Sequence, residues 1–280
     1  MPGFQPPAEP HRYWTCPTNI AGLDPGSITR LIEDDLYDLL RPSLGRESDP
    51  ETLFQIRRDR GAISYGRLQG VVDGRLASLT RFLRKVQLII DTTPAIDPGG
   101  MPMKFRALSG DSHDGGRRPL LLETAKGRWV LKFADPRPHH LLAAVLGELS
   151  QTLGTDLRPP AIIADSTHQW HLMPYLESDG GGDHEVEPFM FSLGALTAVA
   201  YVLAMVDLHL ENVVVADGRP VIVDPECILY NFPTESRRDR LISTGLLSKD
   251  PSLSAMRGGD TSRNGFKQVG LSESPLGKSH

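Results

Sequence analysis

The stretch that most restricts the fold is DLHLENVVVADGRPVIVD, which runs from Asp207 to Asp224. It contains two runs rich in Val and Ile, separated by Asp217 and Gly218. Two such runs joined by an Asp-Gly pair predict a β-hairpin, because this pair accepts the left-handed backbone that tight hairpin turns require. A hairpin returns the chain to its starting point, so we expect Asp224 to lie beside Asn212.

The polar residues at the open end of this hairpin are those that phosphoryl transfer requires. Asp207 and Asn212 have the D-x-x-x-x-N spacing of the catalytic loop in protein kinases, where the carboxylate accepts the proton of the substrate hydroxyl. Asn212 and Asp224 supply two oxygen ligands, which suit a hard cation such as Mg²⁺. We therefore expect Asp207 to be catalytic, and Asn212 and Asp224 to bind Mg²⁺ and, with it, ATP.

The upstream chain carries a lysine suited to phosphate binding. Residues 103–133 predict strand, loop, strand, turn and strand, and Lys132 lies in the last of these strands, RWVLKF. A helix is expected next, with Pro138 in its first turn and Gly154 just past its end. Glu148 on this helix is the candidate partner of Lys132. The loop GDSHDGG, between the first two strands, does not match the G-x-G-x-x-G pattern of kinases.

Charge and cysteine content exclude several classes of function. A net charge of -5 and a pI near 6.0 give no electrostatic reason to expect binding to nucleic acid or to an acidic membrane surface. The segment from Phe189 to Val206 has no charged side chain, but its polar residues and acidic flanks favour a buried helix over a membrane span. Cys16 and Cys227 are too few for a disulfide framework, so we expect a cytoplasmic protein.

The 280 residues suffice for one large domain or two small ones, and composition divides them into three segments. Residues 1–98 contain helical patterns, including a helix that Ser27 is expected to cap. Residues 99–178 follow a boundary rich in Pro and Gly and predict a small, mainly β lobe. Residues 179–280 predict a partial helical lobe that carries the hairpin and ends in a ragged tail. The expected fold class is α+β, kinase-like and two-lobed, with an N-terminal helical region and an incomplete C-terminal lobe.

Several motifs, taken in order, resemble one known family. DSHDGGR before the strand lysine, DLHLENVVV after the apolar helix, PVIVDPECILYNF and STGLL are similar to motifs of the dehydratase domain of class II lanthipeptide synthetases, the LanM-type enzymes. The resemblance is clearest between residues 104 and 250. It implies a lipid-kinase-like fold that uses ATP and Mg²⁺ to phosphorylate Ser and Thr of a precursor peptide, and then eliminates phosphate to leave dehydroamino acids.

The resemblance also implies roles for individual residues. Lys132 would contact the ATP phosphates. Asp207 would be the catalytic carboxylate, with His209 and Asn212 beside it, and Asp224 would bind magnesium. The family usually continues the lysine as Lys-Pro-Arg, whereas this chain has KFADPRP, which puts the phosphate contact of the family's arginine in doubt.

Three further positions match the family. Glu226, in DPE, fits a D-x-E pattern and would assist the metal or its waters. Asp111 and His113 match positions that the family uses for phosphate elimination, where a basic group must remove the α proton.

The departures from the family limit the expected activity. Family members are several times longer and continue into the remaining dehydratase lobe and a zinc-bearing cyclase domain, whereas this chain ends at His280. We expect no cyclase, and phosphorylation at most from this chain alone. A separate protein that supplies the missing parts is an expected partner, beside the precursor peptide.

Two other functions stay open at this point. DLHLEN also resembles the loop of aminoglycoside and choline phosphotransferases, whose acceptor is a small hydroxyl compound. A catalytically inactive, truncated binding module is the third possibility. Cys227 is expected to be a small buried side chain rather than a nucleophile. The histidines at 139–140 and at 168 and 171 are not expected to bind zinc, because they lack a third ligand at fitting spacing.

Overall fold

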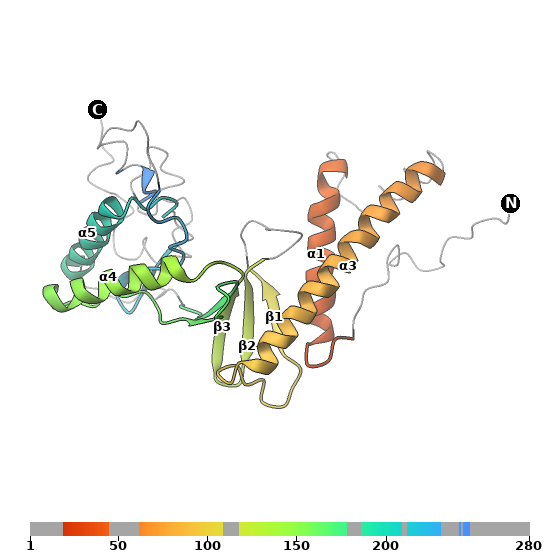
Figure 1. Ribbon diagram of the computed structural model, residues 1–280, viewed down its shortest axis with the longest axis horizontal. Coiled ribbons are helices and arrows are strands. Elements are labelled where there is room, and N and C mark those ends of the chain that lie inside the picture. The colour runs from red at the N-terminus through yellow and green to blue at the C-terminus, as the bar shows by residue number, and fades with distance from the viewer. Residues whose placement is uncertain are drawn as a thin grey trace. The chain divides into compact units, whose positions relative to one another are not determined.

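The computed structural model describes residues 19–44, 62–108, 118–177, 186–208, 212–230, 241 and 243–246 (Figure 1). Helices and antiparallel strand pairs both occur in these ranges, so the predicted mixture of α and β structure is confirmed. The chain divides into two compact units, Met1–Lys132 and Phe133–His280. The segment boundaries expected at residues 98 and 178 stay predictions.

Two helices of the first unit, α1 (Pro25–Leu44) and α3 (Ala62–Thr92), pack against each other. The side chain of Asp24 accepts hydrogen bonds from the backbone N–H of Ser27 at 2.8 Å and from its hydroxyl at 3.0 Å. Asp24 is therefore the cap of α1, and the expectation that Ser27 caps it was wrong. Pro25 suits the first helical position, because its fixed φ is helical and its missing N–H needs no partner there.

The interface of α1 and α3 combines an apolar stripe with one ion pair. Asp35 on α1 is only 1% exposed and accepts two hydrogen bonds from the guanidinium of Arg75 on α3, each at 2.6 Å. This forked geometry satisfies both carboxylate oxygens, which a buried charge requires. The apolar stripe of α1 comprises Ile28, Leu31, Ile32, Leu36 and Leu40, all buried.

A three-stranded antiparallel meander completes the described part of this unit. It consists of β1 (Lys104–Ala107), β2 (Leu120–Thr124) and β3 (Gly127–Lys132), as the alternation of residues 103–133 predicted. The turn between β2 and β3 pairs Thr124 with Gly127. Leu120, Leu121 and Leu122 are all buried, so both faces of the central strand are covered.

The outer edge of β1 is bonded to the segment that leads into α1. The backbone N–H of Met103 donates to Gly22 O at 2.7 Å, and the N–H of Phe105 donates to the hydroxyl of Ser27 at 3.1 Å. The N–H of Asp24 donates in turn to Met103 O at 2.9 Å. Gly22 has φ 78°, a left-handed conformation that glycine adopts at no steric cost. The start of α1 is thereby fixed to the sheet.

The second unit begins with α4 (Arg137–Leu153) and a short antiparallel pair, β4 (Ile163–Ala164) and β5 (His171–Pro174). Helix α4 has proline in its first turn and ends at Gly154, as predicted. Gly154 has φ 67°, and its N–H donates to Ser150 O at 3.0 Å. This left-handed glycine satisfies a carbonyl that the helix end would otherwise leave unbonded.

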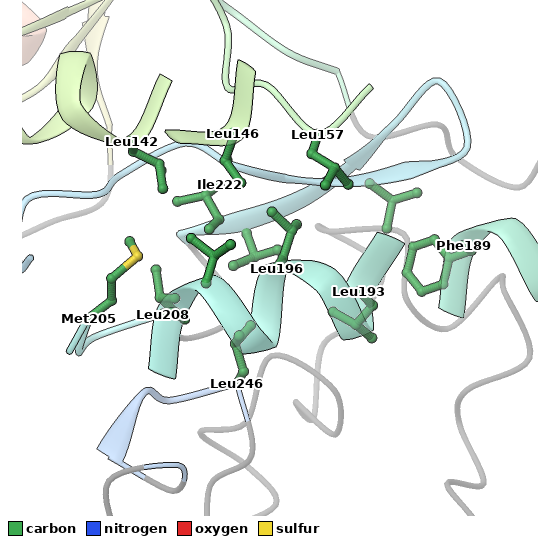
Figure 2. Packing of buried hydrophobic residues seen from close by; sticks show 14 residues of the cluster. Leu142, Leu146, Leu157, Phe189, Leu193, Leu196, Met205, Leu208, Ile222 and Leu246 are labelled. Atoms are coloured by element: carbon green, nitrogen blue, oxygen red, sulfur yellow. The ribbon is translucent and has the colours of Figure 1, made fainter. Parts of the chain in front are cut away.

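The core of the second unit lies between α4, the apolar helix α5 (Val186–Val202) and the hairpin of β6 (Val213–Ala216) and β7 (Arg219–Ile222). Figure 2 shows Leu146 of α4 and Leu196 of α5 on either side of Ile222 of β7. Met205 and Leu208, which follow α5, are also fully buried in this core. Among the described helices, none is both long and apolar enough to cross a bilayer.

Candidate functional site

The hairpin that the sequence predicted is present. Strands β6 and β7 pair antiparallel from Val213 opposite Ile222 to Ala216 opposite Arg219. The two turn residues, Asp217 and Gly218, have φ 51° and 70°. Positive φ at both central residues is the requirement of a type I′ turn, which matches the twist of the flanking strands.

Asn212 links the two arms at the open end of this hairpin. Its backbone carbonyl accepts a hydrogen bond from the N–H of Val223 at 2.9 Å, so Asp224 follows directly after its partner. The side-chain N–H of Asn212 donates to the backbone carbonyl of Asp207 at 2.8 Å. This bond uses the amide nitrogen of Asn212, so the amide oxygen, Oδ1, takes no part in it. The hairpin therefore brings the residue before Asp224 beside Asn212, as predicted, and the side chain of Asn212 is bonded to the backbone of Asp207.

Asp207 has a backbone conformation that side-chain-bearing residues rarely adopt. Its φ is 66°, in the left-handed region, which Asp enters more readily than most residues. The chain is anchored on both sides of it: the N–H of Val206 donates to Cys227 O at 3.0 Å, and the N–H of Leu208 donates to Thr244 O at 2.7 Å. Because these neighbours are fixed, the surrounding structure can hold a conformation that costs about 1 kcal/mol or more. The Asp207 side chain itself is exposed.

Acidic side chains gather around Asp207. One side-chain oxygen of Asp207, one of Glu226 and the sulfur of Cys227 all lie within 4.8 Å of one another. Burial raises the pKa of the Cys227 thiol, and the negative charges of three carboxylates raise it further, those of Glu226, Asp207 and Asp224. We call these three carboxylates the carboxylate cluster. Both effects disfavour the thiolate form of this half-buried side chain.

The donor set of this cluster fits a hard divalent cation. Carboxylate and carboxamide oxygens are the ligands that Mg²⁺ and Ca²⁺ prefer. A protonated thiol is a poor ligand for such an ion, since metals bind the thiolate. Among the described residues, the one group of three or more His, Cys, Asp or Glu side chains close enough to hold a metal ion is Asp207, Glu226 and Cys227, and it contains no histidine.

One known protein family matches most of the chain. A model described as a domain of unknown function, DUF4135, matches residues 67–261, which is more than half of the chain. The chain belongs to the DUF4135 family. No curated protein matches the sequence significantly.

The DUF4135 match begins within α3 and contains every member of the carboxylate cluster. It also contains Lys132 and Glu148. Lys132 is the last residue of β3 and is half-buried, and it belongs to the first compact unit. Glu148 lies on α4 in the second unit, with an exposed side chain that lines an apolar groove. The expected pairing of Glu148 with Lys132 stays a prediction.

Three predicted site residues of the DUF4135 domain, Asp111, His113 and His209, lie outside the described residues. Their assigned roles in elimination and catalysis stay predictions. The exposed carboxylate of Glu226, in contrast, lies within the group around Asp207. Its D-x-E position after the hairpin was the signal for that placement.

Sequence reasoning assigned no role in the site to two residues that shape this part of the DUF4135 domain, Cys227 and, within the STGLL motif, Thr244. Cys227 was expected to be only a small buried side chain, yet its sulfur lies within 4.8 Å of carboxylate oxygens of Asp207 and Glu226. Thr244 is 1% exposed, and its carbonyl anchors the residue after Asp207. The adjacency of Cys227 to Glu226 was an available signal, whereas the partnership of Thr244 with Leu208 depends on a long-range backbone contact that no local pattern encodes.

Proposed function

We propose that this DUF4135 domain is a kinase-like phosphotransferase that moves the γ-phosphoryl group of ATP to a hydroxyl group. The observation that carries the proposal is the position of Asn212, whose side chain bonds Asp207 O and whose backbone bonds the residue before Asp224. This gives the D-x-x-x-x-N motif and its downstream Asp the proximity that phosphoryl transfer needs.

Asp207 is the proposed base. The acceptor oxygen forms a bond to the γ-phosphorus while the bond from that phosphorus to the bridging oxygen breaks. ADP leaves, and the hydroxyl proton passes to the Asp207 carboxylate. The exposure of this side chain suits a group that must meet a substrate hydroxyl, and the anchored backbone on either side would hold it in place.

Asn212, Asp224 and Glu226 are the residues that would hold Mg²⁺. When bound, the ion neutralises negative charge on the phosphate oxygens and orients the nucleotide. Lys132, at the end of β3, is the proposed contact of the ATP phosphates. We do not include Glu148 as its partner in the proposal, because the Glu148 carboxylate is exposed and lines an apolar groove.

A peptide is the proposed acceptor. The support is the likeness of DLHLENVVV, PVIVDPECILYNF and STGLL to the dehydratase domain of class II lanthipeptide synthetases. The proposed reaction is phosphorylation of Ser or Thr in a precursor peptide, the first step toward dehydration. The proposal ends at the phosphopeptide. Elimination and cyclisation are assigned to a partner protein.

The test compares Asp207→Asn with Asp217→Asn in a phosphotransfer assay. Both residues are exposed aspartates with left-handed backbone, and Asp217 lies at the far end of the hairpin. The chain is incubated with Mg²⁺, ATP and a panel of Ser- and Thr-containing peptides, each beside its alanine-substituted form, and phosphopeptides are identified by mass spectrometry. We expect Asp207→Asn to lower the rate by a factor on the order of 100 or more, and Asp217→Asn to leave it unchanged.

Two outcomes contradict the proposal in different ways. Equal rates for the wild type and Asp207→Asn would remove the proposed base. Phosphorylation of aminoglycosides or choline, with no peptide phosphorylated, would replace the peptide acceptor by a small hydroxyl compound.

A further inference from the structure

A long apolar groove lies on the second unit between α4 and α5, with a volume of about 780 Å³. Its lining extends along α5 from Met190 to Val202, which at 1.5 Å per residue is about 18 Å, and includes Leu203 just past the helix end. Large apolar side chains are exposed along it: Met190 at 39%, Phe191 at 52%, Val202 at 77% and Leu153 at 37%. Soluble proteins rarely leave contiguous apolar surface of this kind without a binding partner.

The shape of the groove fits a helix. Helix α5 contributes large residues at both ends of the groove and small ones, Gly194, Ala195 and Ala198, in the middle. A Cβ atom added at Gly194 would meet nothing within 4 Å, so the space above this position is open. Helix-in-groove recognition places the apolar face of one amphipathic helix in a hydrophobic groove, with anchoring side chains at positions i, i+3, i+4 and i+7. Small central residues let such a helix approach closely.

The charge of the groove indicates the kind of partner. Glu148 is the one charged residue among its lining residues, and none of them is basic. Among the described residues, no ion pair to the Glu148 carboxylate is found. A second copy of this face would bring only another carboxylate to Glu148. An acidic membrane surface is equally unsuited, because amphipathic helices that bind membranes carry basic residues beside their apolar face.

We propose that this groove binds one amphipathic α-helix of a partner protein, with the apolar stripe of that helix inward and a Lys or Arg against Glu148. The proposal is independent of the phosphotransfer chemistry. The sequence predicted a protein partner but did not indicate where it binds. The groove is the proposed binding surface on this domain.

The test uses three synthetic peptides of equal length. The first is an amphipathic helix of four to five turns with a leucine stripe and one lysine beside it. The second carries glutamate in place of that lysine, and the third has the residues of the first in scrambled order. Each is labelled with a fluorophore and titrated with the full chain, and binding is followed by fluorescence anisotropy.

The variants are Ala198→Glu in the groove, Glu148→Lys at its edge, and Ala77→Glu as the matched control. Ala77 is an exposed alanine on α3 in the other unit. We expect the wild type to bind the lysine peptide and Ala198→Glu to weaken this binding by about tenfold or more, because the substitution places a charge in an apolar interface. Ala77→Glu should have no effect. Glu148→Lys should weaken binding of the lysine peptide and strengthen that of the glutamate peptide, each on the order of threefold.

Three results overturn the proposal. They are no saturable binding of the lysine peptide to the wild type, equal binding of the scrambled peptide, or unchanged binding by Ala198→Glu. Analytical ultracentrifugation decides the remaining alternative. If the wild type is a dimer that Ala198→Glu, but not Ala77→Glu, converts to a monomer, the groove binds a second copy and the partner helix is excluded.

Discussion

Asn212 makes one observed hydrogen bond and one proposed metal contact, and a single substitution can separate their effects. Its amide nitrogen bonds Asp207 O, and its amide oxygen is a proposed ligand of Mg²⁺. Asn212→Asp keeps an oxygen ligand but cannot donate to the Asp207 carbonyl, whereas Asn212→Ala loses both. We expect Asn212→Asp to retain Mg²⁺-dependent nucleotide binding while kcat falls by about fivefold or more, from the loss of one hydrogen bond. Isothermal titration with Mg²⁺-ATP and turnover assays distinguish these effects. Full turnover by Asn212→Asp would exclude the positioning role.

Cys227 reports the electrostatics of the carboxylate cluster through the pH dependence of its reactivity. Only the thiolate reacts with iodoacetamide, and a raised pKa means that less thiolate is present at any given pH. In a Cys16→Ser background, we expect alkylation to have its midpoint above the ordinary thiol pKa. Glu226→Gln should lower that midpoint, because it removes a nearby negative charge, and Asp217→Asn should not. A midpoint below the ordinary value would contradict the observed cluster.

At the scale of elements, the β6–β7 hairpin depends on its turn. Gly218 has φ 70°, where a β-branched side chain collides with its own backbone. We expect Gly218→Val to lower the free energy of unfolding by about 1–2 kcal/mol, as measured by urea denaturation. Asp217→Gly, at the neighbouring left-handed position, should be tolerated. If Gly218→Val is as stable as the wild type, the turn is not the type described.

Elements were predictable wherever a local pattern determines them. The Val-rich runs around Asp217 and Gly218 predicted the hairpin, and Gly154 predicted the end of α4, because left-handed positions select for few residue types. The cap of α1 was misplaced by three residues, since both Asp24 and Ser27 are good capping residues and only the bonds between them decide. The proximity of Asn212 and Asp224 followed from the hairpin. The approach of Cys227 to Asp207 did not, because it requires pairing of two segments outside any regular strand.

At the scale of the whole molecule, nucleotide binding should appear as stability. A ligand that binds only the folded state raises its free energy of unfolding with occupancy. At about 100 times the dissociation constant, Mg²⁺-ATP should raise the melting temperature by roughly 5–10 °C. Differential scanning fluorimetry should show that the increase needs both ATP and Mg²⁺ and is lost in Asp224→Asn. An equal increase in Asp224→Asn would remove this residue from the proposed site.

The bonds between β1 and the segment before α1 have a consequence for solubility. An open sheet edge presents a row of N–H and C=O groups that can recruit a strand from another molecule. Here the N–H groups of Met103 and Phe105 are already taken by Gly22 and Ser27. The protein therefore occupies the first part of this edge with its own chain, which leaves fewer backbone groups there for a strand of another molecule to pair with.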